Sequence, residues 1–214
     1  MKKRPRRTPT HRKKRPVTTP DHSRQGPDEG TPPESIPRAI PAVAIIHQEG
    51  AIALIAVFAL SFRDGGLLGA LRSPISLLTA IVLGLAVGAG SFALLWLARG
   101  VGPLHALESW QRGMVRGWGP IDIAAVAVVS GLAEEALVRA LLQPIVGLIP
   151  AALLFAVLHV VPDRRLWLWP MLAFVLGVVL GLVFEHAGYP AAAAAHIAIN
   201  GLSLSRLRES KKVE

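Results

Sequence analysis

The sequence contains no cysteine among its 214 residues. This absence excludes disulfide bonds, thiolate metal ligands and a cysteine nucleophile. Charged residues are also scarce, because Asp, Glu, Lys and Arg make up 17% of the chain, against about a quarter in an ordinary soluble domain. Apolar residues make up 52%. Most of the chain is therefore too apolar to be a soluble globular domain.

The positive charge that is present is concentrated at the N-terminus. The first 38 residues hold 11 Lys and Arg against 4 Asp and Glu, which gives them a net charge of +7. Residues 1–39 have too few apolar side chains to offset the entropy lost on folding. We expect them to form a disordered cytoplasmic tail that lies against anionic lipid headgroups rather than on nucleic acid. A second basic tail is predicted over residues 206–214.

The rest of the chain divides into apolar runs. A membrane-spanning helix needs about 20 apolar residues, because the hydrocarbon core is about 30 Å thick. Six segments reach or approach this length and predict an all-α polytopic bundle of about six transmembrane helices over residues 40–205. The segments are Ile40–Phe62, Ser76–Ala98, Ile121–Gln143, Ile145–Val161, Leu166–Phe184 and Tyr189–Ser205.

The connections and the basic residues predict how these segments cross the membrane. The short links 143–145 and 185–188 predict antiparallel hairpins. Lys and Arg favour the cytoplasmic side, and their positions place both termini inside, in what we expect to be a bacterial plasma membrane. Residues 104–118 mix Trp and Arg and predict an interfacial amphipathic helix with Trp110 and Trp118 at headgroup level.

Two apolar segments contain small residues at GxxxG spacing, at Gly84–Gly88 and Gly177–Gly181. Such residues let helix backbones approach closely in lipid. We expect them to serve packing within the bundle rather than dimerisation.

The third apolar segment carries Glu134, Glu135 and Arg139 within six positions. A charge at the centre of a span costs about 2.5–3.5 kcal/mol on insertion scales. Glu135 and Arg139 lie four residues apart on one helical face and are expected to pair. Glu134 is rotated about 140° from Arg139. It is therefore the carboxylate without a cationic partner on its own helix, and such a group is suited to act as a general base.

Two later segments also place polar side chains in the membrane. His159 shares a helical face with Phe155, and His196 shares one with Asn200. Each has a structural explanation when taken alone: a histidine bonded to a backbone carbonyl, a Glu–Arg pair between helices, or an asparagine bonded across helices. Their concentration on three helices favours one functional polar site instead.

Four ionisable residues near segment ends fit a simpler interpretation. His47 and Glu49 begin the first segment, and Glu185 and His186 end the fifth. We expect all four to be solvated at the membrane interface.

The polar residues also form three motifs in order. They are EExxxR over 134–139, FxxxH over 155–159 and HxxxN over 196–200. On successive hydrophobic segments they resemble the CPBP intramembrane protease family, which includes CAAX prenyl endopeptidases and the bacteriocin-processing or immunity proteins of the Abi type. The resemblance covers about residues 120–205. It implies an all-helical membrane core that hydrolyses peptide bonds of membrane-associated peptides or proteins.

The resemblance also implies a role for each motif residue. Glu134 and His159 would activate the attacking water, and His196 and Asn200 would stabilise the oxyanion. Supporting residues would be Glu135, Arg139 and Phe155. Relatives are often labelled metalloproteases, and Glu134, His159 and His196 match the two-His-one-carboxylate set of a zinc site. The same residues serve a metal-free glutamate mechanism, so both alternatives stay open.

Two other kinds of function fit the same residues. A non-catalytic immunity or scaffolding relative would keep the cavity and bind without cutting. A small proton-coupled transporter would use intramembrane Glu and His as a proton relay. Transport predicts an internal repeat between the two halves, whereas the polar residues here gather in the C-terminal half.

Overall fold

The computed structural model describes residues 39–100 and 102–209, and all regular structure in them is helical. A π-helical stretch, Ala136–Leu142, joins the fifth and sixth α-helices into one continuous rod. The α-helices are α1 (Ala42–Ser61), α2 (Gly66–Ala70), α3 (Leu77–Leu97), α4 (Gly102–Met114), α5 (Pro120–Glu135), α6 (Gln143–Val146), α7 (Leu148–Leu158), α8 (Leu168–Ala187) and α9 (Tyr189–Glu209).

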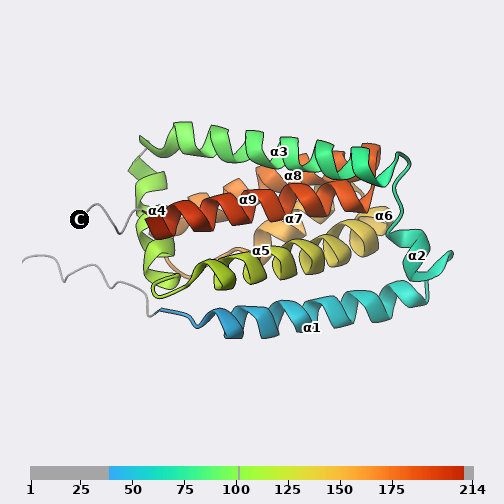
Figure 1. The fold of residues 1–214 in the computed structure, drawn as a ribbon, viewed down its shortest axis with the longest axis horizontal. Helices are drawn as coiled ribbons and strands as arrows, with labels where there is room; N and C mark the ends of the chain where they lie inside the picture. Colours follow the sequence, from blue (N-terminus) through green and yellow to red (C-terminus); the bar gives the residue numbers. More distant parts are fainter. Residues whose placement is uncertain (1–38, 101, 210–214) are drawn as a thin grey trace, which may run out of the picture. The chain divides into compact units, whose positions relative to one another are not determined.

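The long helices run side by side in alternating directions (Figure 1). Helix α9 packs between α3 and α5, and α1 packs along the other side of α5. Helices α7 and α8 form an antiparallel pair behind them, and α4 crosses one end of the bundle. The residues between 120 and 202 thus form the centre of the bundle, and α1 and α3 flank it.

Three helical segments are long and apolar enough to cross a membrane: Ala42–Ser61, Leu77–Gly100 and Arg164–Ala187. They coincide with the first, second and fifth predicted spans, whose length and apolar composition the helices bear out. Helix α7 is apolar but has only 11 residues, and α5 and α9 carry the polar side chains of the site. The number of six spans stays a prediction.

Helix α7 is shorter than the sequence predicted. Gly147 has φ +87°, a left-handed conformation that favours glycine, and it ends α6 and begins α7. The predicted hairpin at 143–145 is therefore displaced, because Gln143 and Ile145 still belong to α6. At its other end α7 stops at Leu158, so His159 is the first residue beyond it. About 11 residues of helix span only about half of a bilayer core.

Small residues let α9 lie very close to both of its neighbours. A Cβ atom added to Gly84 or Gly88 of α3 would overlap the carbonyl oxygens of Ala191 and Ala195. On the other side, Gly131 of α5 has no room for a side chain beside Ile197. In α8, a Cβ atom added to Gly181 would overlap Leu148 and Gln143, and Gly177 lies closely against Ala152 of α7. Both GxxxG patterns serve packing within the bundle, as predicted.

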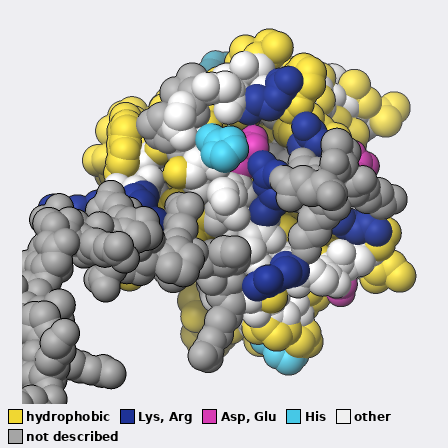
Figure 2. Space-filling view, turned by 90° about the vertical axis from the view of Figure 1, so that its left-hand side faces the viewer, with side chains coloured by type: hydrophobic (Ala, Val, Ile, Leu, Met, Phe, Trp, Pro, Cys, Tyr) yellow, Lys and Arg dark blue, Asp and Glu magenta, His cyan; other side chains and the backbone are white. Residues whose placement is uncertain are grey.

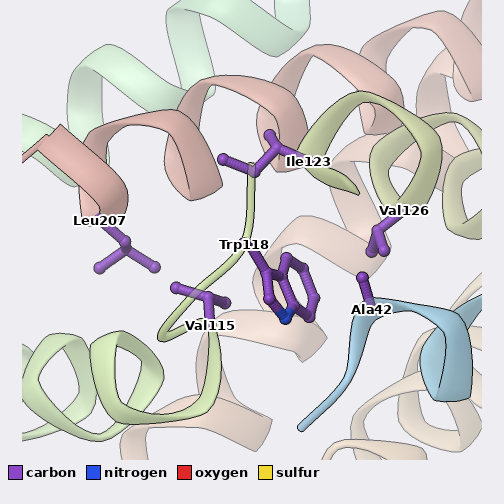
Figure 3. Packing of buried hydrophobic residues seen from close by; sticks show 6 residues of the cluster. All are labelled: Ala42, Val115, Trp118, Ile123, Val126 and Leu207. Carbon is purple, nitrogen blue, oxygen red and sulfur yellow. The ribbon is translucent and has the colours of Figure 1, made fainter. Parts of the chain in front are cut away.

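Trp118 is buried within the bundle, and its depth in the membrane stays a prediction. Its side chain is 6% exposed, and its indole Nε1 donates a hydrogen bond of 2.8 Å to the Ile40 carbonyl. The ring fills the junction of α1, α5 and α9 (Figure 3). The amphipathic helix is confirmed as α4, but it ends at Met114, before this tryptophan. The cluster around Trp118 consists of Ala42, Val115, Ile123, Val126 and Leu207.

Candidate active site

The predicted ion pair forms at the end of α5. Arg139 Nε lies 3.0 Å from Glu135 Oε2, and both side chains are completely buried. The guanidinium also lies 5.3 Å from the centre of the Phe155 ring, within reach of a cation–π interaction. The π-helical stretch begins directly after Glu135, and such stretches are frequent at functional sites.

Glu135 binds a second partner that the sequence did not reveal. Its Oε1 lies 2.8 Å from Nδ1 of His196 on α9. One carboxylate thus connects Arg139 on its own helix with an imidazole on a neighbouring helix. The contact fixes the His196 ring and leaves its Nε2 free to face other groups.

Glu134 is the carboxylate that does not pair with Arg139. Its Oε2 lies 4.0 Å from His196 Nε2 and has no hydrogen-bond partner among the described residues. The side chain is 16% exposed. The helical spacing predicted that Glu134 would face away from Arg139, and in the structure Arg139 pairs with Glu135 instead.

Asn200 is held by Ser130, which the sequence analysis missed. The amide Nδ2 donates to Ser130 Oγ over 2.9 Å, and the serine is buried on α5. Ser130 stands four residues before Glu134 and therefore on the same helical face. That spacing was the signal by which it could have been found.

His159 adopts the carbonyl-bonded form that we had named as its structural alternative. Its Nδ1 donates to the Phe155 carbonyl over 2.8 Å, since a carbonyl oxygen only accepts. In the neutral ring Nε2 is then an acceptor. The Phe155 ring lies 4.6 Å from the His159 ring and 6.0 Å from the His196 ring, centre to centre. Phe155 thus lies against both imidazoles.

All four predicted catalytic residues line one cavity of about 360 Å³, namely Glu134, His159, His196 and Asn200. A second cavity of about 160 Å³ lies against the same two histidines and Asn200, with mostly apolar side chains of α4 and α8 on its other walls. The fully buried Glu135–Arg139 pair stands behind the first cavity. The arrangement offers a free carboxylate, two imidazoles and an amide to a molecule that enters it.

The part of the chain that contains the three motifs matches a known family. Residues 116–202 match the family model described as Type II CAAX prenyl endopeptidase Rce1-like. The matched segment belongs to this family. The resemblance that the motifs predicted is thereby confirmed, and the match supports endopeptidase activity in general terms. Together with the three apolar helices, it identifies the chain as an integral membrane protein. In comparisons with curated proteins and with solved structures, no match to the chain was found.

The polar groups of the Rce1-like segment do not assemble a metal site. Among the residues that the structure describes, no three His, Asp or Glu side chains are grouped so that they could hold a metal ion. Of the three predicted ligands, Glu134 and His196 approach to 4.0 Å, while His159 uses Nδ1 on its own helix. The predicted zinc set therefore does not fit this arrangement, and we derive no chemical step through a metal.

One further carboxylate reaches the cavity from outside the Rce1-like segment. Glu49 of α1 is 5% exposed and lines the same 360 Å³ cavity as Glu134. The expectation that Glu49 is solvated at the interface is wrong, because α1 packs this residue against α5. The other three interfacial candidates, His47, Glu185 and His186, are exposed as expected.

Proposed function

We propose that the protein is an intramembrane endopeptidase that hydrolyses peptide bonds of membrane-associated peptides or proteins. One observation carries the proposal: the unpaired carboxylate oxygen of Glu134 faces a cavity that His159, His196 and Asn200 also line. Membership of the segment in an endopeptidase family supports it. Glu134 and His159 act on the water, and His196 and Asn200 act on the carbonyl oxygen.

In the first step Glu134 accepts a proton from a water molecule in the cavity. His159 positions this water, because its Nε2 accepts a hydrogen bond while Nδ1 is held by the Phe155 carbonyl. The hydroxide oxygen bonds to the carbonyl carbon of the substrate, and the carbonyl π electrons move to the oxygen. A base held within hydrogen-bond distance of its water typically contributes a factor of about 10²–10⁴ to the rate.

The negative charge that develops on the carbonyl oxygen is met by donors from α9. Asn200 uses one amide hydrogen on Ser130 and has a second one to offer. His196 donates through Nε2 when both ring nitrogens carry protons, and Glu134 and Glu135 then serve as its counter-ions. Removing one such donor typically costs about 10²–10³ in kcat.

The intermediate then collapses and completes the reaction. The oxyanion electrons re-form the carbonyl, the C–N bond breaks, and the leaving amine takes the proton that Glu134 received from water. The products are a carboxylic acid and an amine, so one water is consumed for each bond cleaved. Glu134 returns to its ionised state.

The test is peptide cleavage by the full-length protein purified in detergent. Wild type is compared with Glu134→Gln, which keeps the size of the side chain and removes its basicity, and with His159→Ala. We expect cleavage of a peptide library by wild type and a loss of at least about 10²-fold in both variants. Glu185→Gln makes the same chemical change at an exposed position and serves as the control.

Four outcomes would contradict the proposal in different ways. Cleavage that persists in Glu134→Gln and His159→Ala would refute the mechanism. Binding of peptides without any cleavage by wild type would favour a non-catalytic immunity or scaffolding protein. Proton-dependent solute uptake by reconstituted vesicles, again without cleavage, would favour a transporter. Loss of cleavage on adding a chelator, restored by zinc, would assign the site to a metalloprotease.

A further inference from the structure

Glu49 occupies a packing position in the seam between α1 and α5. The buried residues of α1 are Ala42, Glu49, Ala56 and Leu60, so the first three recur every seven residues, as in a helix–helix seam. At one end of the seam Ala42 packs near Val126, and at the other Ala56 and Leu60 pack near Ala136. Glu49 is the charged residue among small and apolar ones.

The same register places Glu49 opposite the catalytic face of α5. The stretch of α5 between Val126 and Ala136 presents Ser130 and Glu134, and both line the 360 Å³ cavity together with Glu49. Helix α1 lies outside the segment that matches the family model. Glu49 is therefore a contribution of the flanking helix to the cavity.

One oxygen of the Glu49 carboxylate, Oε2, has no hydrogen-bond donor among the residues that the structure describes. The Glu49 side chain is more than nine-tenths buried. A buried carboxylate without a partner is costly. Packing does not explain it, because Ala fills the equivalent position one heptad earlier and one heptad later.

Donors of three residues that line the cavity are engaged by acceptors of the protein. His159 Nδ1 is held by Phe155, His196 Nδ1 by Glu135, and one Asn200 hydrogen by Ser130. The positive charge of Arg139 is directed at Glu135. The cavity thus presents two carboxylates with unpaired oxygens, from Glu49 and Glu134. A cationic group would satisfy both the hydrogen-bonding capacity and the charge of these two carboxylates.

We propose that Glu49 is a specificity-determining residue that binds the cationic side chain of a Lys or Arg in the substrate peptide, close to the bond presented to Glu134. This inference rests on the proposed peptidase function. It specifies the substrate class further: membrane-associated peptides with a basic residue near the cleaved bond. The cavity walls, which include Ile45, Ile52 and Leu204, take the apolar part of such a side chain.

The test measures peptide affinity, which does not depend on turnover. A fluorescently labelled apolar peptide carries Lys or norleucine at one position at a time, because norleucine keeps the chain and lacks the ammonium group. Dissociation constants for the full-length protein in detergent are measured by anisotropy before any product is detected. We expect wild type to bind the Lys peptide about 10-fold or more tightly than the norleucine peptide at one position.

In Glu49→Gln the ratio of the dissociation constants of the norleucine and Lys peptides should fall towards one. In the matched control Glu185→Gln the ratio should remain as in wild type. An unchanged ratio in Glu49→Gln would overturn the inference, as would a wild-type ratio near one at every position. The melting temperature of Glu49→Ala provides a second measurement. We expect it to equal or exceed that of wild type, and a large decrease with an unchanged binding ratio would make Glu49 a structural residue.

The two proposals fail in distinguishable ways. If Lys selectivity depends on Glu49 but no Glu134-dependent cleavage is observed, the peptidase function fails and the binding site stands. If cleavage depends on Glu134 but no Lys selectivity is observed, the inference about Glu49 fails and the peptidase function stands.

Discussion

At the scale of single residues, the site depends on one carboxylate with two partners. Glu135 binds Arg139 through one oxygen and His196 through the other, at 3.0 and 2.8 Å. A buried ion pair is a weak source of stability, but removing one member leaves an uncompensated charge. Glu135 therefore serves mainly to hold His196 in place, and Arg139 offsets the cost of burying Glu135.

Arg139→Met should lower the free energy of unfolding by about 3–5 kcal/mol, because Glu135 then keeps its charge without the guanidinium. The double variant Glu135→Gln with Arg139→Met should recover much of this loss, since no unpaired charge remains. It should still be inactive, because His196 has lost its carboxylate acceptor. Thermal unfolding in detergent and peptide cleavage measure the two effects separately. An Arg139→Met variant as stable as wild type would contradict this account.

Ser130 acts on the reaction through Asn200. Ser130→Ala removes the acceptor of the Asn200 amide and should lower kcat about 10-fold, with little change in KM, because the amide is no longer aimed at the oxyanion. The cost in stability should be about 1 kcal/mol. Ser61→Ala, at an exposed position where the hydroxyl donates to Val57, is the control. Equal kcat values in the two variants would argue against a positioning role for Ser130.

At the scale of helices, the sequence predicted what is determined within one helix. The Glu135–Arg139 pair and the free Glu134 followed from spacing along α5 alone. The Glu135–His196 and Ser130–Asn200 contacts join residues 61 and 70 positions apart. They depend on how α5 and α9 are packed, which the periodicity of neither helix specifies. Glu49 was misjudged for the same reason, since its burial depends on the register between α1 and α5.

Helix ends were predicted less well than helix centres. The apolar run around α7 continues through Val160 and Val161, so hydropathy extended the helix beyond its end at Leu158. Pro162 follows directly, and helices usually end at or before the residue that precedes a proline. This early end places His159 inside the bundle and within reach of the cavity.

The glycines of α3 provide a test of helix packing. Gly84→Ala should destabilise the protein by about 1–3 kcal/mol, because the added methyl group would overlap the backbone of α9. Gly90→Ala, on the same helix with no atom close to the added methyl group, should be neutral or slightly stabilising. The melting temperatures of the two variants in detergent measure the difference. Equal melting temperatures would show that α3 and α9 do not pack in this way.

At the scale of the whole bundle, positive charge gathers at one end. Helices α3, α7 and α9 end there, and α1, α5 and α8 begin there (Figure 1). Viewed onto that end, Arg side chains lie around the exposed surface (Figure 2). The arginines at these helix ends and on α4 are Arg99, Arg112, Arg116, Arg164, Arg165, Arg206 and Arg208. The opposite end has Arg63 and Arg72, which follow α1 and α2.

This asymmetry predicts that the basic end faces the cytoplasm. The absence of native cysteine makes the prediction simple to test, because a single introduced thiol gives no background. Ser109→Cys on α4 and Asp64→Cys beyond α1 both replace exposed residues, at opposite ends of the bundle. A membrane-impermeant maleimide should label Asp64→Cys in intact cells, and Ser109→Cys only in inverted vesicles. The reverse pattern would show that the basic end faces outwards. Labelling of both variants from one side would show that α3, the long helix between the two positions, does not cross the membrane.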